Sequence, residues 1–186
     1  MDKYSMDYAL TGQDIYNIVN DGSEMKGNPE SCGIIEYGDL YNVDRLEQLM
    51  IDDNLVILYR SSPKSAHWCC IFKNQEGLNF FDPYGTVIDN EIDQIEHINP
   101  EYANDYYHGG KKRLIELILN GDYKDITYNN YKTQEMKNNI NTCGRHVATR
   151  LLFKKYTLEE YVETLFKMSK EKYLDDIVLK ITNKII

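Results

Sequence analysis

The chain has few of the residues that mark secreted or membrane proteins. Only four of its 186 residues are proline and four are cysteine. Four unevenly spaced cysteines are too few for a disulfide framework, so we expect free thiols in a reducing compartment and a protein that is not secreted. The opening segment 1–12 carries charges and lacks the apolar core of a signal peptide, and no apolar run long enough to cross a membrane follows. We therefore expect no membrane association.

Positive charge is also scarce. There are 21 Lys and Arg against 30 Asp and Glu, which gives a formal net charge of −9 and a pI near 4.9. Binding of nucleic acid through counterion release needs clustered basic side chains, so this balance argues against a nucleic-acid partner. Two short basic runs, 111–113 and 154–155, lie in helical patterns among acidic residues and are typical of solvated helix faces.

The remaining composition is that of one folded domain. Hydrophobic residues make up 42% and charged residues 27%, and 16 residues are tyrosine. A chain of this length can bury a substantial core without disulfides or metals. We find no internal repeat and no low-complexity linker. We predict a single domain over residues 1–186 that acts as a monomer.

Hydrophobic periodicity predicts strands in the middle of the chain and helices at both ends. Apolar runs separated by turns predict strands at 55–59, 67–72 and 78–81, which would form a small meander, and a further strand at 126–128. Helices are predicted at 11–19, 44–50, 111–119, 143–156 and 157–169, and a loop at 27–38. This order indicates an α+β domain with a small central, mostly antiparallel sheet flanked by helices.

A late helix begins at a cysteine. Ala148, Leu151 and Leu152 recur at helical spacing after Cys143, so we predict that Cys143 lies at a helix N-terminus. Unpaired N–H groups and the positive end of the helix dipole favour a thiolate there. Gly144 would keep the approach to the sulfur open. The alternative is that Cys143 is a small buried apolar residue, as free cysteine often is.

Two strand ends carry side chains that could activate this thiol. His67 opens the second central strand, and alternation sends it and Trp68 to opposite faces of the sheet. Asp82 ends the next strand, because Pro83 favours extended geometry before it. If the two strands are antiparallel neighbours, His67 and Asp82 lie side by side, where a carboxylate can orient an imidazole. Each residue alone also has an ordinary structural interpretation.

With Trp68 after the histidine and Gly144 after the cysteine, the order His67, Asp82, Cys143 resembles the superfamily of adenovirus-type maturation proteases and deSUMOylating proteases. The Cys-Gly-Arg-His form is most similar to proteases of virophages, polinton-like elements and large DNA viruses. The resemblance implies that Cys143 is the nucleophile, His67 the base and Asp82 the group that orients the base.

The resemblance also implies residues around the triad. A glutamine before the nucleophile would stabilise the oxyanion, and Gln134 stands nine residues before Cys143, somewhat further than is usual in the family. Trp68 and Gly144 would bind substrate, and the Trp68 side chain would cover a narrow channel that holds the substrate glycines. Other amide donors are available in the loop before Cys143: Asn138, Asn139 and Asn141.

These residues predict a cysteine endopeptidase, and its compactness favours a viral maturation protease. Such an enzyme would cleave capsid or other virion precursors at small, Gly-containing sites, in the virion and the infected host-cell cytoplasm. No cofactor or DNA is expected, although a peptide activator is compatible with the resemblance. Three alternatives stay open: a deSUMOylase or deubiquitinase, an acetyltransferase that uses the same triad, and an inactive module that binds ubiquitin-like tails.

A second set of spacings permits a different interpretation. His67-x-Cys69 and Cys143-x-x-His146 could together offer two histidines and two cysteines to zinc. A Cys-x-x-His pair within a regular helix matches closed zinc sites poorly, so we expect no metal. His146 is also the competing candidate for the general base, and we expect its side chain to point away from the thiol or to serve the fold.

Overall fold

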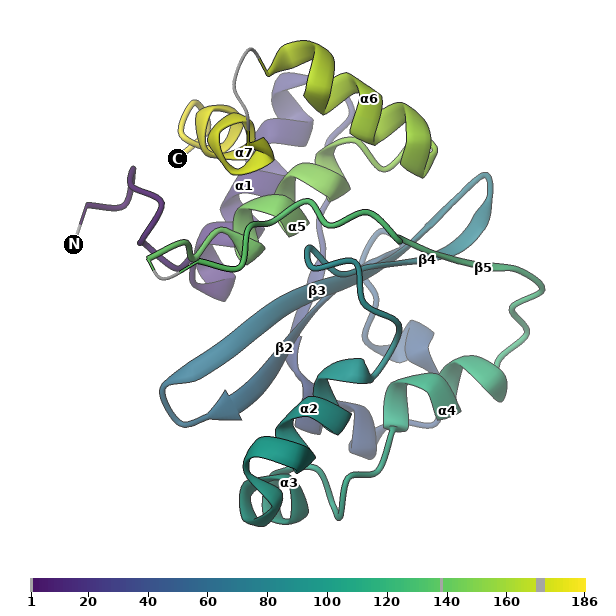
Figure 1. Cartoon of the computed structure of the whole chain (residues 1–186). Coiled ribbons are helices and arrows are strands. Elements are labelled where there is room, and N and C mark those ends of the chain that lie inside the picture. The colour runs from purple at the N-terminus through teal and green to yellow at the C-terminus, as the bar shows by residue number, and fades with distance from the viewer. Residues whose placement is uncertain (1, 138, 170–172) are drawn as a thin grey trace.

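The computed structural model describes residues 2–137, 139–169 and 173–186, and the described strands form one five-stranded sheet in the order β1-β2-β3-β4-β5 (Figure 1). The strands are β1 (Gly33–Glu36), β2 (Asn54–Ser62), β3 (Ser65–Asn74), β4 (Gly77–Phe81) and β5 (Ile126–Tyr128). The α-helices are α1 (Gly12–Met25), α2 (Asn90–Ile98), α3 (Pro100–Tyr106), α4 (Arg113–Leu119), α5 (Cys143–Leu152), α6 (Leu158–Met168) and α7 (Leu174–Thr182). Two 3₁₀ helices, η1 (Tyr37–Asn42) and η2 (Leu46–Gln48), follow β1.

The predicted α+β class and the central meander are confirmed. Strands β2, β3 and β4 are antiparallel neighbours, whereas β1 pairs with β2 and β5 with β4 in parallel, so the sheet as a whole is mixed. The predicted loop at 27–38 was wrong in its second half, which contains β1. A side chain at Gly33 would put its Cβ 2.0 Å from the Leu49 carbonyl oxygen, so only glycine fits at the start of this short edge strand.

Helices cover both faces of the sheet and bury a core on each. In Figure 1, α1, α5, α6 and α7 lie on one side of the sheet and α2, α3 and α4 on the other. The alternation of β3 assigns Trp68, Cys70 and Phe72 to the first core. It assigns Cys69 and Ile71 to the second. A site that uses residues from both faces of the sheet must therefore lie at an end of the sheet, where the two faces meet.

Three predicted helix starts can be compared with the structure. Thr11 caps α1 in a capping box with Asp14, and Thr157 caps α6 in a capping box with Glu160. The helix predicted at 44–50 was wrong. Only the 3₁₀ turn η2 forms there. Its N-cap is Arg45, and the Gln48 side chain accepts the Asp44 and Arg45 amides. Helices α2, α3 and α7 were not predicted.

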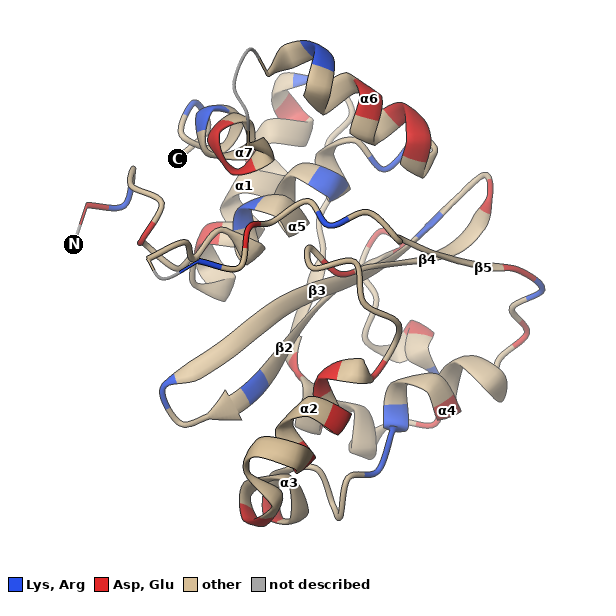
Figure 2. Ribbon diagram, in the orientation of Figure 1, with Lys and Arg blue, Asp and Glu red and all other residues tan. Residues whose placement is uncertain are grey.

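Basic side chains are spread over separate elements in Figure 2. Within the first basic run, Lys112 lies 2.7 Å from Asp93 and Arg113 2.9 Å from Glu116. Lys154 of the second run lies 2.8 Å from Glu30. Basic residues of both runs are therefore paired with acidic side chains. None of the described helices combines the length and apolar composition that a membrane span requires.

Candidate active site

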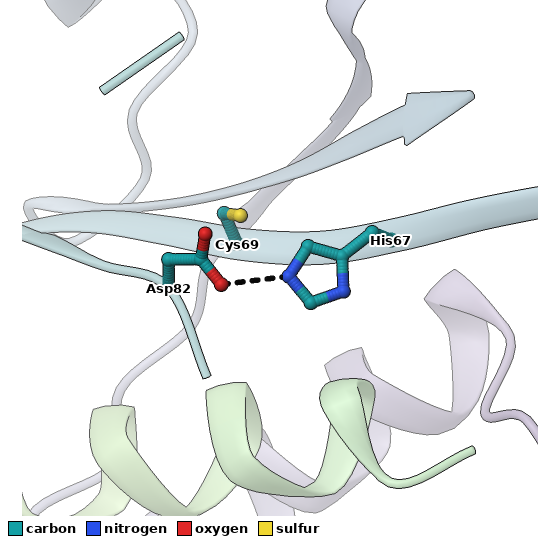
Figure 3. Close-up of side chains that lie close together, drawn as sticks. All are labelled: His67, Cys69 and Asp82. Carbon is teal, nitrogen blue, oxygen red and sulfur yellow. Dashed lines mark hydrogen bonds and ion pairs between the residues drawn. The ribbon is translucent and has the colours of Figure 1, made fainter. Parts of the chain in front are cut away.

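His67 and Asp82 are joined by a hydrogen bond, as the sequence predicted. His67 Nε2 donates to Asp82 Oδ1 at 2.8 Å, and Asp82 is fully buried (Figure 3). The ladder pairs Cys70 with Phe81, so the next residue, Asp82, lies beside Cys69, and His67 reaches it as the diagonal neighbour. The strands β3 and β4 thus fix both ends of the hydrogen bond.

Asp82 is held by further contacts that the sequence did not reveal. Its Oδ1 also accepts the backbone N–H of Tyr84 at 2.8 Å, and its Oδ2 accepts the Thr86 hydroxyl. Asn129, just after β5, accepts from the Asp82 amide at 2.9 Å and donates to the Asp82 carbonyl at 2.7 Å. The Tyr84 and Thr86 contacts fix the direction of the carboxylate, and the Asn129 contacts hold its backbone.

The imidazole has an aromatic ring and two thiols near it in addition to the carboxylate. The Tyr84 ring stacks on His67 with ring centroids 4.4 Å apart and an interplanar angle of 13°. Burial alone would lower the pKa of His67, but its interactions with Cys69, Asp82 and Cys143 outweigh burial and raise the pKa well above its ordinary value. Since Nε2 is used by Asp82, Nδ1 is the nitrogen left for the Cys143 thiol.

Cys143 is the first residue of α5, as predicted, and is 8% exposed. The helix is preceded by Thr142, whose hydroxyl makes no capping hydrogen bond to α5. The first N–H groups of a helix have no intrahelical acceptor. The amides of the first turn therefore remain available for negative charge that develops next to the sulfur.

A cavity of about 710 Å³ opens beside Cys143, and its wall includes Trp68. Trp68 Nε1 donates to the Leu10 carbonyl at 3.0 Å, which ties the segment before α1 to β3 next to the thiol. Gly144 lies in a closely packed place. A Cβ there would lie 3.1 Å from Leu10 and Ile15 and 3.3 Å from Trp68, so Gly144 allows α5 to pack closely on these residues, and its part in substrate binding stays a prediction.

Gln134 is buried in the segment that runs back past the site. Its backbone N–H donates to the Pro83 carbonyl at 3.0 Å, which ties it to the residue after Asp82. Its side chain is held weakly, because Nε2 lies 3.5 Å from the Ile140 carbonyl and Oε1 has no hydrogen-bond partner. Of the other amides considered, Asn141 donates to the Asp7 carbonyl at 2.8 Å. Asn138 lies outside the described residues.

His146 does not join this site. It is fully buried, and its Nε2 lies 3.0 Å from Asp175 Oδ1. Within the described part of the chain, the side chains close enough to hold a metal ion are instead His67, Cys69 and Asp82, whose ligand atoms lie within 4.8 Å of one another. The four residues considered for zinc are therefore not gathered, since His146 is occupied by a carboxylate of its own.

Similar proteins are found among known sequences and among solved structures. The chain is 29% identical over 94% of its length to "Uncharacterized protein V9" of the Sputnik virophage, covering 88% of that protein. Among solved structures, it is similar to the pS273R protease of ASFV, with a TM-score of 0.49, 9% identity and coverage of 100% of this chain and 70% of the other. The SUMO protease Ulp1 gives a TM-score of 0.39 and 11% identity, with 98% and 81% covered. No family model matches the chain.

Proposed function

We propose that this chain is a cysteine endopeptidase. The observation that carries the proposal is the chain of contacts from Asp82 through His67 to Cys143, which lies at the start of α5 beside a cavity. A nucleophile, a base within hydrogen-bond reach and a third group that orients the base are the parts of nucleophilic catalysis. No metal or cofactor is needed for this chemistry.

In the proposed reaction, His67 accepts the thiol proton and Cys143 Sγ attacks the peptide carbonyl. His67 then donates the proton to the leaving amine, and a water molecule activated by His67 hydrolyses the thioester. Gln134 and the first-turn amides of α5 stabilise the oxyanion. A single donor of this kind is worth about 3 kcal/mol of the activation barrier.

Selective alkylation tests the nucleophile. Cys32, Cys69 and Cys70 are at most 1% exposed, and burial raises the pKa of Cys32 to about 12. Iodoacetamide or a vinyl-sulfone peptide should therefore label Cys143 first, as mass spectrometry of tryptic peptides would show. First labelling of another cysteine, with cleavage intact in Cys143→Ala, would refute the assignment.

We further propose that the substrates are capsid or other virion precursors, cleaved at small, Gly-containing sites in the virion or the infected host-cell cytoplasm. Similarity to a virophage protein supports a viral role, and Trp68, which donates to Leu10, lines the same cavity as Cys143. The test is incubation with virion precursors and sequencing of new N-termini, with Cys143→Ala as control. Cleavage confined to the tails of ubiquitin-like proteins would favour an isopeptidase instead.

We propose that duplex DNA is not required, because Lys112, Arg113 and Lys154 of the basic runs are paired with acids. Peptide cleavage should change little with DNA across a salt series. Stimulation of about tenfold that fades with salt would contradict this.

A further inference from the structure

One buried carboxylate, Asp175 in the first turn of α7, contacts both segments that supply the proposed reaction. Its Oδ1 accepts the Thr142 hydroxyl, and its Oδ2 accepts the backbone N–H of Glu135 at 3.0 Å. Thr142 directly precedes Cys143, and Glu135 directly follows Gln134. The same Oδ1 also accepts from His146 on the second turn of α5. Asp175 is itself fully buried.

These contacts use Thr142 in an unusual way. A threonine at a helix N-cap ordinarily accepts an N–H of its own helix, which satisfies one of the orphan donors. Here the Thr142 hydroxyl donates to Asp175 instead and makes no capping bond. A capping interaction is typically worth about 1 kcal/mol, so this diversion needs a compensating role. It leaves the first-turn amides of α5 uncapped next to Cys143.

We propose that Asp175 is a positioning residue that fixes Cys143 relative to Gln134. This inference rests on the proposed function and deepens it. Gln134 is weakly held by its own side chain, so its place depends on its backbone, which is tied at one end to Pro83 and, through Glu135, to Asp175. The carboxylate contacts both segments at once. Asparagine in its place keeps the shape, but its NH₂ group cannot accept a hydrogen bond, so one of the two segments is released.

The test separates oxyanion stabilisation from thiol reactivity. Asp175→Asn should lower kcat for peptide cleavage about tenfold or more with KM changed by less than about threefold. Alkylation of Cys143 by iodoacetamide forms no oxyanion, so its rate should stay within about threefold of wild type. The exposed Asp21→Asn on α1 is the matched control and should change neither rate.

A double-mutant cycle decides whether Asp175 acts through Gln134. If it does, Gln134→Ala combined with Asp175→Asn should lose no more than about twofold beyond Gln134→Ala alone. Fully additive losses, equal losses in cleavage and alkylation, or an unchanged kcat would overturn the proposal.

If Asp175→Asn is unfolded by circular dichroism, Thr142→Val removes one contact from the other side and is judged by the same criteria. Failure of the proposed function is distinguishable, since wild type would then neither cleave peptides nor label at Cys143.

Discussion

The molecule contains two buried histidine–aspartate pairs of nearly the same geometry. His67 and Asp82 are 2.8 Å apart, and His146 and Asp175 are 3.0 Å apart. The pKa values of the two histidines are nevertheless shifted in opposite directions. Burial lowers the pKa of His146 despite its aspartate, whereas the surroundings of His67 raise its pKa. The contact between histidine and aspartate therefore does not identify an active site by itself.

The difference lies in the remaining neighbours of each ring. His67 also interacts with Cys143 and is 8% exposed, while His146 is fully enclosed and its Nδ1 has no partner. A neutral ring that donates from Nε2 to Asp175 leaves only a lone pair unsatisfied. Protonation would bury an unpaired N–H, which costs more free energy. His146 is thus suited to the fold, and His67 to proton transfer.

The largest difference between the two pairs is expected when each histidine is replaced in turn. His67→Ala should lower kcat about 10³-fold or more, because the thiol loses its base. His146→Gln can keep a donor to Asp175 and should retain kcat within about fivefold of wild type once the folded fraction is measured. Steady-state peptide cleavage provides both values. The reverse pattern, an active His67→Ala and an inactive but folded His146→Gln, would exchange the roles.

Changing the carboxylate of the first pair should have a smaller effect. Asp82→Asn should lower kcat/KM about 10²- to 10³-fold and leave activity above that of His67→Ala, because the carboxylate orients the base without transferring the proton itself. The Asn129 contacts hold the backbone of residue 82 in place, and the Thr86 hydroxyl remains next to its side chain. If Asp82→Asn matches either wild type or His67→Ala, the orienting role is wrong.

The first pair could be predicted from sequence because its parts are local. A strand of period two, a turn at 74–77 and a proline after Asp82 together place His67 and Asp82 near one another. The helix start at Cys143 follows from the spacing of apolar residues after it. Only the diagonal register, which places Cys69 next to Asp82, had to come from the structure.

The second pair could not be predicted, because its partners lie 29 residues apart on helices whose packing has no local signature. Helix α7 was not predicted, so Asp175 had no position in the sequence interpretation. The same holds for Asn129, which follows a three-residue edge strand, and for β1, which is too short for alternation to be read. Long-range packing, rather than weak propensity, limits what the sequence shows.

The pH dependence of stability would sharpen the contrast between the pairs. His67 has a raised pKa, so its contribution to the free energy of unfolding is fully present below about pH 6.5 and is lost as pH rises through the folded pKa. His146 has a lowered pKa, so its contribution is present above about pH 6.5 and is lost as pH falls through the folded pKa. The two histidines therefore stabilise the fold in opposite pH ranges.

Urea unfolding from about pH 4 to about pH 10 would measure these slopes. In a plot of the free energy of unfolding against pH, His67→Gln should flatten the alkaline side and His146→Gln the acidic side. Part of the acidic slope should remain, because Asp175 also has a lowered pKa, which hydrogen bonds from His146 and Thr142 hold down against burial. Slopes that change on the opposite sides would show that the two environments have been assigned the wrong way round.

The smallest effect is expected from removing metal ions. His67, Cys69 and Asp82 offer three possible ligand atoms, but Asp82 already accepts from His67, Tyr84 and Thr86. Burial also raises the pKa of Cys69 well above its ordinary value, so the thiolate that zinc requires is disfavoured. A chelator should therefore change peptide cleavage by less than about twofold, and Cys69→Ala should respond in the same way as wild type. Metal analysis of the purified protein completes the test. The prediction would be wrong if wild type contained one equivalent of zinc, lost both zinc and activity in the chelator, and if Cys69→Ala contained none. The site would then be a metal centre rather than a triad, and His146–Asp175 would be the only structural pair of this kind among the described residues.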